Sequence, residues 1–266
     1  MRTQTTRSAY THVNIVALFA ASLSIALTIG GCPTGVGNIG SSARLPDSPP
    51  DFAAARFSDP TTIDNTYFPL VPGSIVTFEG TTESGLERFV SEVLAETKEV
   101  AGVASRVVLV REYIDGVLVE ETRDWFAQDD DGNVWYMGEA VDNYELDAAG
   151  NLFVANNNGA WEAGKDVAGA GSVAQPGFIM PGSPGVGDLY YQEFYAGEAE
   201  DVGEVVALAV SLTLRDGTTY TCLRTRDTTP LEPDTREFKY YVAGIGLIAE
   251  EDIASGDRLE LIERVP

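Results

Sequence analysis

Apolar and polar residues alternate in short runs along most of the chain after residue 75. Such runs include SIVTFEG, ERFVSEVLAE, ASRVVLVREYI, TTYTCLR and RLELIERV, which are rich in β-branched and aromatic residues. Turn-favouring pairs separate them, among them Ser84-Gly85, Asp115-Gly116, Asp216-Gly217 and Gly256-Asp257. A period of two indicates strands, and tight turns join such strands in antiparallel order. We therefore predict an all-β, mainly antiparallel fold, built as a single curved meander sheet or half-barrel.

One run does not fit this alternation. In residues 198–210, EAEDVGEVVALAV, the apolar positions Val202, Val205, Val206 and Ala209 have helical spacing. A strand and a short helix both remain open for this stretch.

A segment rich in glycine and proline interrupts the strand pattern between Asn156 and Asp188. It contains eight glycines and three prolines, yet it also carries Trp161, Phe178 and Met180. A segment of this length without regular structure is usually functional or disordered, and its large apolar side chains argue against disorder. We predict a long loop that lies over one face of the sheet.

The run that follows, DLYYQEFYAG, offers aromatic side chains for that loop to pack against. Alternation places Tyr191, Glu193 and Tyr195 on one face of this run. A mostly apolar pocket with a few polar groups is the usual composition of a ligand site. The predicted ligand-binding residues are therefore Trp161, Phe178, Met180, Tyr191, Glu193 and Tyr195. In the alternative interpretation, loop and strand complete an ordinary core.

The N-terminus has the features of an export signal. Two arginines precede an apolar stretch that ends in the sequence TIGGC, at Cys32. This ending resembles the lipobox of bacterial lipoproteins, in which the cysteine is acylated and becomes the first mature residue. The alternative is an ordinary secretory signal with an incidental cysteine. We predict a signal peptide over residues 1–31, lipidation of Cys32, a flexible tether over residues 32–56 and one β-rich domain over residues 57–266.

Charge limits which partners the exported protein can approach. The chain has 17 basic and 41 acidic residues, a formal charge of −24. Removing the signal segment, which holds two arginines and no acid, leaves 15 basic residues and a formal charge of −26. Such a charge repels nucleic acid and anionic headgroups. We therefore predict a protein of the bacterial cell envelope, attached to the membrane by its lipid, and we exclude nucleic acid as a partner.

Few types of catalytic side chain are available. His12, the only histidine, lies in the predicted signal segment, so Ser-His-Asp and Cys-His machinery and imidazole metal sites are excluded from the mature chain. Cys222 lies in a strand-like run and is expected to be a buried, inert thiol. There is no nucleotide-binding glycine motif, and we predict no cofactor.

Carboxylate chemistry remains open, because glycoside hydrolysis needs only two acidic side chains at a suitable separation. Glu121, Asp124, Glu139 and Glu193 lie in strand-like segments beside aromatic residues and are the candidates. The alternative is that they belong to solvated strand faces.

The stretch WFAQDDDGNVWYMGE places three consecutive aspartates between aromatic pairs. An EF-hand alignment on Gly132 puts non-ligating residues at the first and last ligand positions, so that calcium motif fails. Asp131, Gly132 and Asn133 tolerate the positive φ that a tight turn needs. We predict a hairpin turn and no metal site, with weak calcium binding at Asp129 and Asp131 as the alternative.

Five sequence stretches in combination carry a family resemblance. They are YFPLVPGSIVTFEG, DWFAQDDDGNVWYMGE, GAWEAG, IMPGSPGVGDLYYQEFYAGEAED and PLEPDTREFKYYVAGIGLI. Together they resemble an uncharacterised family of bacterial secreted and lipid-anchored β-rich proteins, over nearly all of residues 67–262. The resemblance implies one exported domain and no assigned reaction. Members of such a family often carry tryptophan where this chain has Ile75, and histidine where it has Ser183 and Phe238. The predicted architecture is also similar, more loosely, to half-barrel lipoprotein carriers that hold acyl chains.

Three hypotheses about function follow. The favoured one is a non-enzymatic, lipid-anchored envelope protein whose curved sheet binds a small apolar or amphipathic ligand or an envelope protein. The second is a carboxylate-dependent hydrolase that acts on envelope or extracellular glycans. The third is a structural acidic surface module. A deep apolar concavity favours the first, two facing acids in a cleft favour the second, and a filled interior favours the third.

Overall fold

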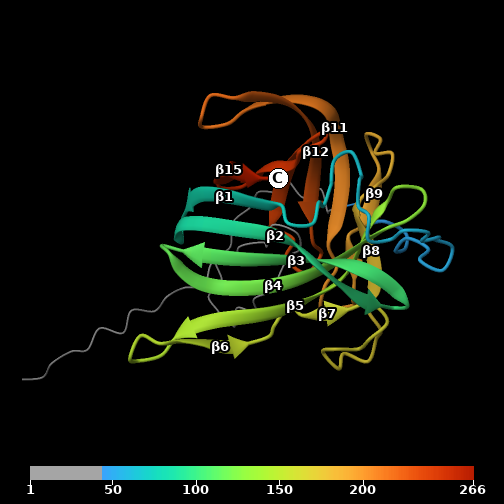
Figure 1. Ribbon diagram of the computed structural model, residues 1–266, viewed down its shortest axis with the longest axis horizontal. Coiled ribbons are helices and arrows are strands. Elements are labelled where there is room, and N and C mark those ends of the chain that lie inside the picture. The colour runs from blue at the N-terminus through green and yellow to red at the C-terminus, as the bar shows by residue number, and fades with distance from the viewer. Residues whose placement is uncertain (1–43) are drawn as a thin grey trace, which may run out of the picture.

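The computed structural model describes residues 44–266, so the predicted signal peptide and Cys32 lie outside the described residues. Every regular element within that range is a strand, and there are fifteen of them (Figure 1). They are β1 (Ile75–Thr82), β2 (Gly85–Val100), β3 (Val103–Ile114), β4 (Val117–Gln128), β5 (Val134–Leu146), β6 (Leu152–Asn156), β7 (Trp161–Glu162), β8 (Gln175–Met180), β9 (Leu189–Tyr191), β10 (Glu193–Phe194), β11 (Val202–Thr213), β12 (Thr219–Thr228), β13 (Arg236–Val242), β14 (Gly246–Asp252) and β15 (Arg258–Val265). Over residues 44–266 there is no helix long and apolar enough to cross a membrane.

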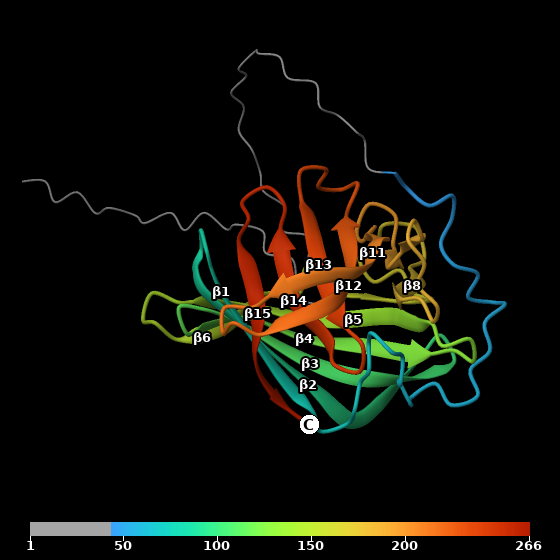
Figure 2. The ribbon, with the colours of Figure 1, turned by 90° about the horizontal axis from the view of Figure 1, so that it is seen from above.

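The strands form one antiparallel sheet that is nearly closed into a barrel. Along the sheet the order is β10-β8-β5-β4-β3-β2-β1-β15-β14-β13-β12-β11-β9, and β6 and β7 pair with other parts of β5. Figure 2 shows the two halves of this barrel, with the strands of the β1 to β5 half below those of the β11 to β15 half. The prediction of an all-β, mainly antiparallel fold with a curved meander sheet is confirmed.

The two ends of the sheet meet in one continuous run of residues. β9 pairs with β11, and β10, which begins two residues after β9 ends, pairs with β8. The run therefore changes partner at Gln192, and this change is the seam of the barrel. Gly177 of β8 lies so close to the seam that a Cβ there would be 2.2 Å from the carbonyl oxygen of Tyr191. The seam can close in this way only where β8 carries no side chain.

Alternation along the strands separates an inner face, which builds the core, from an outer face. On the inner face, Phe78 of β1 lies opposite Phe89 of β2, and Phe126 of β4 lies opposite Tyr136 of β5. The rings of Phe126 and Tyr136 are stacked, with centroids 5.1 Å apart. A second, smaller apolar cluster joins the β11–β12 hairpin to β13 and β14, and it includes Cys222, which is buried as predicted.

The ambiguous stretch at residues 198–210 is a strand. β11 pairs with β12 through two irregularities, one between Val205 and Ala207 and one between Ala207 and Val210. Each irregularity shifts the alternation of side chains between the two faces. The helical spacing does not mark one buried face, because Val202 and Val205 are both buried with no irregularity between them, whereas Ala209 is exposed.

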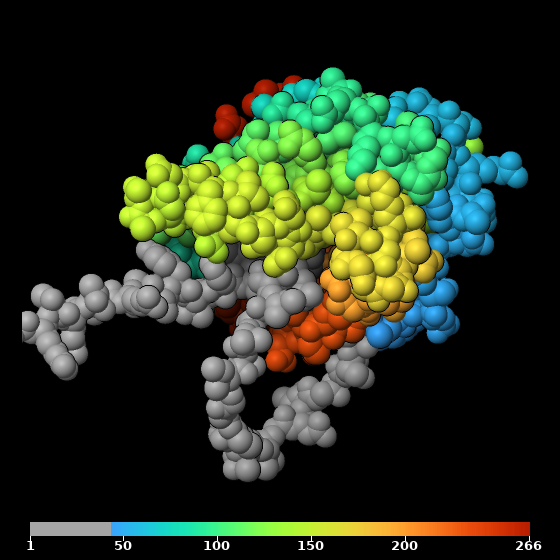
Figure 3. All heavy atoms as spheres, turned by 90° about the horizontal axis from the view of Figure 1, so that it is seen from below, coloured from blue at the N-terminus to red at the C-terminus, as the bar shows by residue number. Residues whose placement is uncertain are grey.

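The glycine- and proline-rich segment contributes two strands to the sheet. Both β7 and β8 lie within it, and both pair with β5. The large apolar residues of the segment are concentrated in these two pieces, which gives each of them a face to bury. The segment is therefore two sheet strands with loops between them and not one uninterrupted loop. In Figure 3 the connection between β7 and β8 forms a yellow knob beside the yellow-green β5–β6 hairpin.

The end of the predicted tether packs against the domain. Phe52, within the predicted tether of residues 32–56, has its ring centroid 5.6 Å from that of Phe57 and 5.3 Å from that of Trp135. The backbone N–H of Asp130 donates to the carbonyl oxygen of Arg56 over 2.8 Å. The packed part of the chain thus begins before residue 57, because Phe52 packs against aromatic side chains of the domain.

A short segment before β1, residues 63–70, packs on one end of the barrel and is called the plug. Asn65 holds it in place, because its side-chain N–H donates to the carbonyl oxygen of Gly132 while its Oδ1 accepts from the backbone N–H of Phe68. Phe68 enters the core, where it is 3% exposed and its ring centroid lies 5.3 Å from that of Phe126. The plug therefore links the β4–β5 turn to the barrel interior.

Candidate functional site

Three of the four candidate carboxylates meet inside the barrel. Asp124 of β4 and Glu139 of β5 are directly opposite each other in the register of the two strands. Glu193, the first residue of β10, lies close enough to both to interact electrostatically with them. All three residues are at most 2% exposed. Tyr136 donates a hydrogen bond from its hydroxyl to Asp124 Oδ1 over 2.8 Å. We call Asp124, Glu139 and Glu193 the acid cluster.

Burial has the largest effect on the protonation of the acid cluster. It raises the pKa of Asp124 to about 7, although the hydrogen bond from Tyr136 opposes the rise. Burial, with the neighbouring carboxylates, also raises the pKa of Glu139 and that of Glu193 well above the usual range. The indole N–H of Trp161 partly offsets the rise at Glu193, in a geometry looser than a hydrogen bond. The cluster therefore retains protons near neutral pH, because ionised carboxyls are unfavourable in a dry site.

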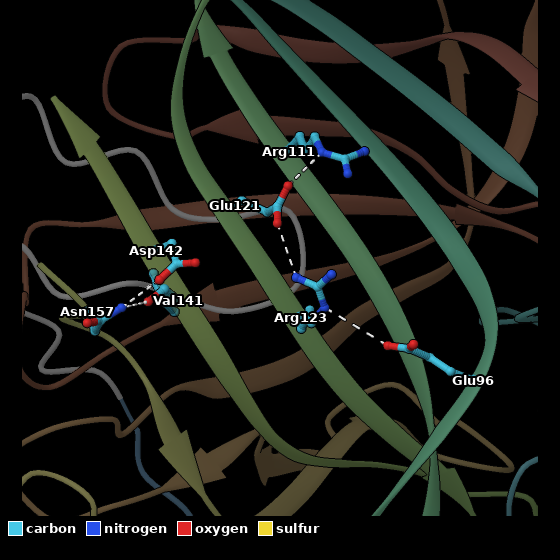
Figure 4. A network of polar contacts seen from close by, with 7 residues as sticks. All are labelled: Glu96, Arg111, Glu121, Arg123, Val141, Asp142 and Asn157. Carbon is cyan, nitrogen blue, oxygen red and sulfur yellow. Dashed lines mark hydrogen bonds and ion pairs between the residues drawn. The ribbon is translucent and has the colours of Figure 1, made fainter. Parts of the chain in front are cut away.

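Glu121, the fourth candidate, lies on the outer face of the barrel. It accepts hydrogen bonds from Arg111 Nε at 2.7 Å and from Arg123 Nη1 at 3.1 Å (Figure 4). Partial burial raises the pKa of Glu121, but the two arginines outweigh that effect and lower it. Residues three apart in a strand point to opposite sides, so Glu121 cannot join Asp124. It belongs to a solvated strand face, which was the alternative interpretation.

A second group of charges lies on β12 to β14. Lys239 is 2% exposed and forms an ion pair with Asp227, with 3.2 Å between Nζ and Oδ2. Burial lowers the pKa of Lys239, but Glu250, Asp227 and Glu237 outweigh burial and raise it well above its usual range. Gln192 at the seam donates to the same Asp227 over 3.0 Å. A cavity of about 20 Å³ lies beside this group, and we call it the seam cavity. Its volume suits a single water molecule.

A larger cavity, of about 50 Å³, lies at the end of the barrel on which the plug packs. It exists because β14 and β15 separate there. Their register holds three residue pairs, from Ala249 and Glu260 to Glu251 and Arg258, whereas β15 continues along β1 as far as Val265. We call this opening the mouth cavity. It is lined by Phe68, Pro69, Leu70, Val71, Ser74, Val76, Phe78, Ser91, Val93, Ile245, Gly246, Leu247 and Arg264.

The mouth cavity is apolar inside and carries one charge at its rim. Buried side chains of the inner faces form its floor, namely Phe78, Ser91, Val93 and Leu247. Arg264 is the one charged residue in the lining, and it is exposed. In the register of β15, Arg264 shares a face with its partner Val76 on β1, while Glu263 points to the other side. An apolar wall with a few polar groups is the usual composition of a ligand site.

Sequence reasoning did not identify the mouth cavity. Part of its signal is present in the sequence, because Val76 and Phe78 alternate in one strand and Ser91 and Val93 alternate in the next. That alternation indicates an inner face. The separation of β14 from β15 has no local signal, since it depends on how far two strands remain paired. The sequence therefore gives no sign that Arg264 differs from other charged residues.

The six predicted ligand-binding residues lie among different neighbours in the fold. Trp161 is 1% exposed, and its ring is edge-on to Tyr136 with centroids 5.2 Å apart. Phe178 packs edge-on against Trp135 at 4.5 Å, beside Met180 on the same strand. Tyr191 contacts Phe194, Tyr195 donates its hydroxyl to Asp166, and Glu193 belongs to the acid cluster. None of the six lines the mouth cavity or the seam cavity. Their role in ligand binding stays a prediction.

The aspartates of the DDDGN stretch hold the predicted turn between β4 and β5. Asp129 accepts four hydrogen bonds of 2.8 to 3.0 Å, from Asp131 N, Asn133 N, Asn133 Nδ2 and Trp135 Nε1. Asp130 accepts two more from the segment that precedes β1. Weak calcium binding at Asp129 and Asp131 was the alternative to this turn, and it stays untested. Across residues 44–266, no three His, Cys, Asp or Glu side chains are grouped to hold a metal ion.

The same turn occurs again between β5 and β6, in the stretch DAAGN. Asp147 accepts hydrogen bonds from Ala149 N, Asn151 N and Asn151 Nδ2 at 2.8 to 3.0 Å. The backbone bonds from Gly150 N to Asp147 O and from Asp147 N to Asn151 O repeat those of the first turn. The pattern D-x-x-G-N therefore encodes one turn geometry twice in this chain, with glycine at the positive-φ position.

Comparison with known proteins reveals a weak structural likeness. No protein-family model matches the chain, and no curated protein matches it either. A crystal structure from Parabacteroides distasonis ATCC 8503, of a protein provisionally assigned as a lipoprotein, is similar over 76% of this chain and 99% of its own. The identity is 13% and the TM-score is 0.39. A likeness of this size does not carry the assignment over to this chain, and the family resemblance inferred from the sequence stays a prediction.

Proposed function

We propose that this protein is exported, anchored to the cell envelope by lipid on Cys32, and binds an apolar or amphipathic ligand in its barrel. The proposal of an anchor rests on the signal-like N-terminus that ends in TIGGC. The proposal of ligand binding rests on the mouth cavity, an apolar opening lined by inner-face residues of the barrel. A non-enzymatic role is the simplest function for such an opening, because binding needs no reactive group.

The walls of the mouth cavity are held in place by backbone hydrogen bonds. Gly73 N donates to Val93 O over 2.7 Å, and Val93 N donates to Ser74 O over 3.0 Å. On the opposite side, Gly244 N donates to Thr66 O over 2.8 Å, which ties the β13–β14 turn to the plug. A preformed cavity loses little conformational freedom on binding, so more of the interaction free energy remains as affinity.

The size of the mouth cavity sets the size of the ligand group. Its volume of about 50 Å³ corresponds to roughly three to five water-sized spaces. A short alkyl chain or the end of a longer one fits this space. Each methylene that leaves water for the cavity contributes about 0.8 kcal/mol.

Methyl NMR with a neutral short-chain alcohol tests the binding proposal. We expect 1-hexanol to shift the methyl signals of Leu70, Val76, Val93 and Leu247 in a saturable way, because these residues line the cavity. A methyl signal of the second apolar cluster, that of Leu212 in β11, serves as an internal reference. Shifts that are absent, or equal at both places, would remove the proposal.

A pair of matched substitutions adds a steric test. Val76→Phe places a ring in the cavity, whereas Val119→Phe makes the same change at a half-buried site on another strand, outside the lining. We expect only Val76→Phe to abolish the hexanol shifts. Melting temperatures of both variants control for unfolding, and binding that survives Val76→Phe would place the ligand elsewhere.

The anchor is tested separately in cells. Growth on a labelled fatty acid should label the wild-type protein, and Cys32→Ser should lose the label because it lacks the acceptor thiol. Equal label on both proteins, or label on neither, would remove the anchor and leave the binding proposal untouched.

The acid cluster favours a second candidate function, hydrolysis of envelope or extracellular glycans. Retaining and inverting glycosidases use two carboxyls about 5 to 9.5 Å apart, one of them with a raised pKa. Asp124 and Glu139 are cross-strand partners with raised pKa values. Both are 2% exposed, however, so substrate reaches them only if the barrel opens around them. The geometry supports this function less well than binding.

Release of reducing ends from cell-wall glycan tests the hydrolase candidate. If it is correct, Asp124→Asn and Glu139→Gln lose activity, while Glu121→Gln on the outer face retains it. The absence of release by the wild-type protein removes this candidate.

A further inference from the structure

We infer that the mouth cavity selects short alkyl chains with an anionic head, and that Arg264 is the residue that selects them. This inference rests on the proposed binding function and names the ligand class for the same site.

The charge of the lining is opposite to the charge of the protein. The chain has 41 acidic residues against 17 basic ones, yet the one charged residue in the mouth lining is an arginine. A strongly acidic surface repels anions. An anionic ligand therefore needs a local cation at its site, and the mouth supplies one.

Arg264 is available for a ligand. Within residues 44–266, no acidic side chain forms an ion pair with it, whereas Arg88, Arg215 and Arg258 are each paired with a glutamate. The nearest acid in sequence, Glu263, points to the opposite face of β15. The guanidinium group matches a carboxylate with two parallel hydrogen bonds.

The position of Arg264 suits a ligand that has an apolar chain and a charged head. The residue lies at the exposed end of β15, whereas the cavity floor at Phe78, Val93 and Leu247 is buried. A ligand can thus place its chain on the floor while its head stays in water beside the guanidinium. This arrangement avoids the desolvation cost of a buried charge.

Three ligands of equal length and different head charge test the selection, namely hexanoate, 1-hexanol and hexylammonium, titrated by methyl NMR. For the wild-type protein we expect hexanoate to bind about five-fold more tightly than hexanol, and hexylammonium to bind most weakly. The hexanoate advantage should shrink in 1 M salt, because Arg264 is exposed and its charge is then screened. A hexanoate affinity no greater than that of hexanol overturns the inference.

Variants of Arg264 assign the effect to this residue. Arg264→Gln should reduce hexanoate to the affinity of hexanol, Arg264→Lys should keep part of the advantage, and Arg264→Glu should make hexylammonium the preferred ligand. Arg56→Gln removes an exposed arginine outside the lining and should change nothing. An advantage that survives Arg264→Gln overturns the role of Arg264.

The same measurements distinguish this inference from the proposed function. If hexanol does not bind at the mouth, the proposed function fails. If hexanol binds but head charge has no effect, only the inference on ligand class fails. A chain-length series from butanoate to octanoate adds a test of size, because each methylene that fits should increase affinity about four-fold. The increase should stop near six carbons, where the cavity is filled.

Discussion

Asp124 lies directly opposite Glu139 across the ladder of β4 and β5, and both residues are 2% exposed. Cross-strand partners have Cβ atoms about 5 Å apart. Two carboxyls at such a separation do not both ionise in a dry site, because desolvation and mutual repulsion both oppose it. The folded chain therefore holds protons that the unfolded chain releases below neutral pH.

We predict that the protein loses stability as the pH rises from about 5 to 8. A carboxyl with a raised folded-state pKa stabilises the fold fully below its unfolded pKa, near 4, and this contribution is lost as the pH rises through the folded value. For Asp124 the folded pKa is about 7. Between the unfolded and the folded pKa, each pH unit lowers the free energy of unfolding by about 1.4 kcal/mol per group. The pKa values of Glu139 and Glu193 are raised as well, which steepens the slope. Urea midpoints at pH 5, 6, 7 and 8 should therefore fall steadily.

Two variants separate the acid cluster from the general acidity of the chain. Glu139→Gln should flatten the pH dependence, because it removes one titrating group and its repulsion of Asp124. Glu145→Gln, at an exposed position of the same strand, should leave the dependence unchanged. Urea midpoints that rise between pH 5 and 8 would contradict the proton-holding cluster.

The strands of this chain can be predicted from the sequence because their two faces differ. β2 alternates between buried and more exposed positions from Glu87 to Val93, and each D-x-x-G-N pattern holds a turn through its own aspartate. The seam cannot be predicted in this way. The exchange of partners at Gln192 depends on the close approach of Gly177, which is distant in the sequence. One glycine among many in a flexible-looking segment carries no local sign of that contact.

The acid cluster could be predicted from the sequence, whereas the mouth cavity could not. Asp124, Glu139 and Glu193 are recognisable as acids beside aromatic residues in strands, and they do converge. Glu121 is also an acid beside aromatic residues in a strand. It differs from Asp124 only in the face that it occupies, because residues three apart in a strand point to opposite sides. The mouth cavity depends on a long-range event, the early end of the pairing between β14 and β15. Sequence patterns report which face a residue occupies, but they do not report where two strands part.

We predict that Asp129 contributes more to stability than Asp147, although both hold the same turn. Asp129 accepts an additional hydrogen bond of 2.8 Å from the buried indole of Trp135, which would be left unsatisfied by Asp129→Ala. A buried donor without a partner costs about 1 to 3 kcal/mol. Asp129→Ala should thus destabilise by about 3 kcal/mol and Asp147→Ala by about 1 kcal/mol in urea unfolding. Equal losses would show that the indole contributes nothing.

We predict that Trp161→Ala behaves as the loss of a core residue. Trp161 is 1% exposed and contacts Tyr136 next to the acid cluster, so its removal leaves an apolar cavity. Replacement of a buried tryptophan by alanine usually costs about 3 to 5 kcal/mol. Hexanol binding at the mouth cavity should persist, because Trp161 is not part of its lining. A loss below about 1 kcal/mol together with altered ligand binding would instead support the ligand-binding role that the sequence predicts for Trp161.

We predict that a single methyl group at Gly177 opens the seam. A Cβ at this position would lie 2.2 Å from Tyr191 O and 2.6 Å from the carbonyl carbon of Gln192, and backbone atoms cannot rotate away as a side chain does. Gly177→Ala should therefore push β8 away from β10 and cost about 3 kcal/mol or more. Gly116→Ala is the matched control, because Gly116 has a φ of 81° but a Cβ there would meet nothing within 4 Å, so it should cost only about 1 kcal/mol.

Hydrogen exchange locates the effect. The β8 and β10 amides should exchange faster in Gly177→Ala, while those of the β2–β3 ladder keep their protection. A Gly177→Ala protein as stable as Gly116→Ala, with unchanged exchange at β10, would show that the barrel does not close through this contact.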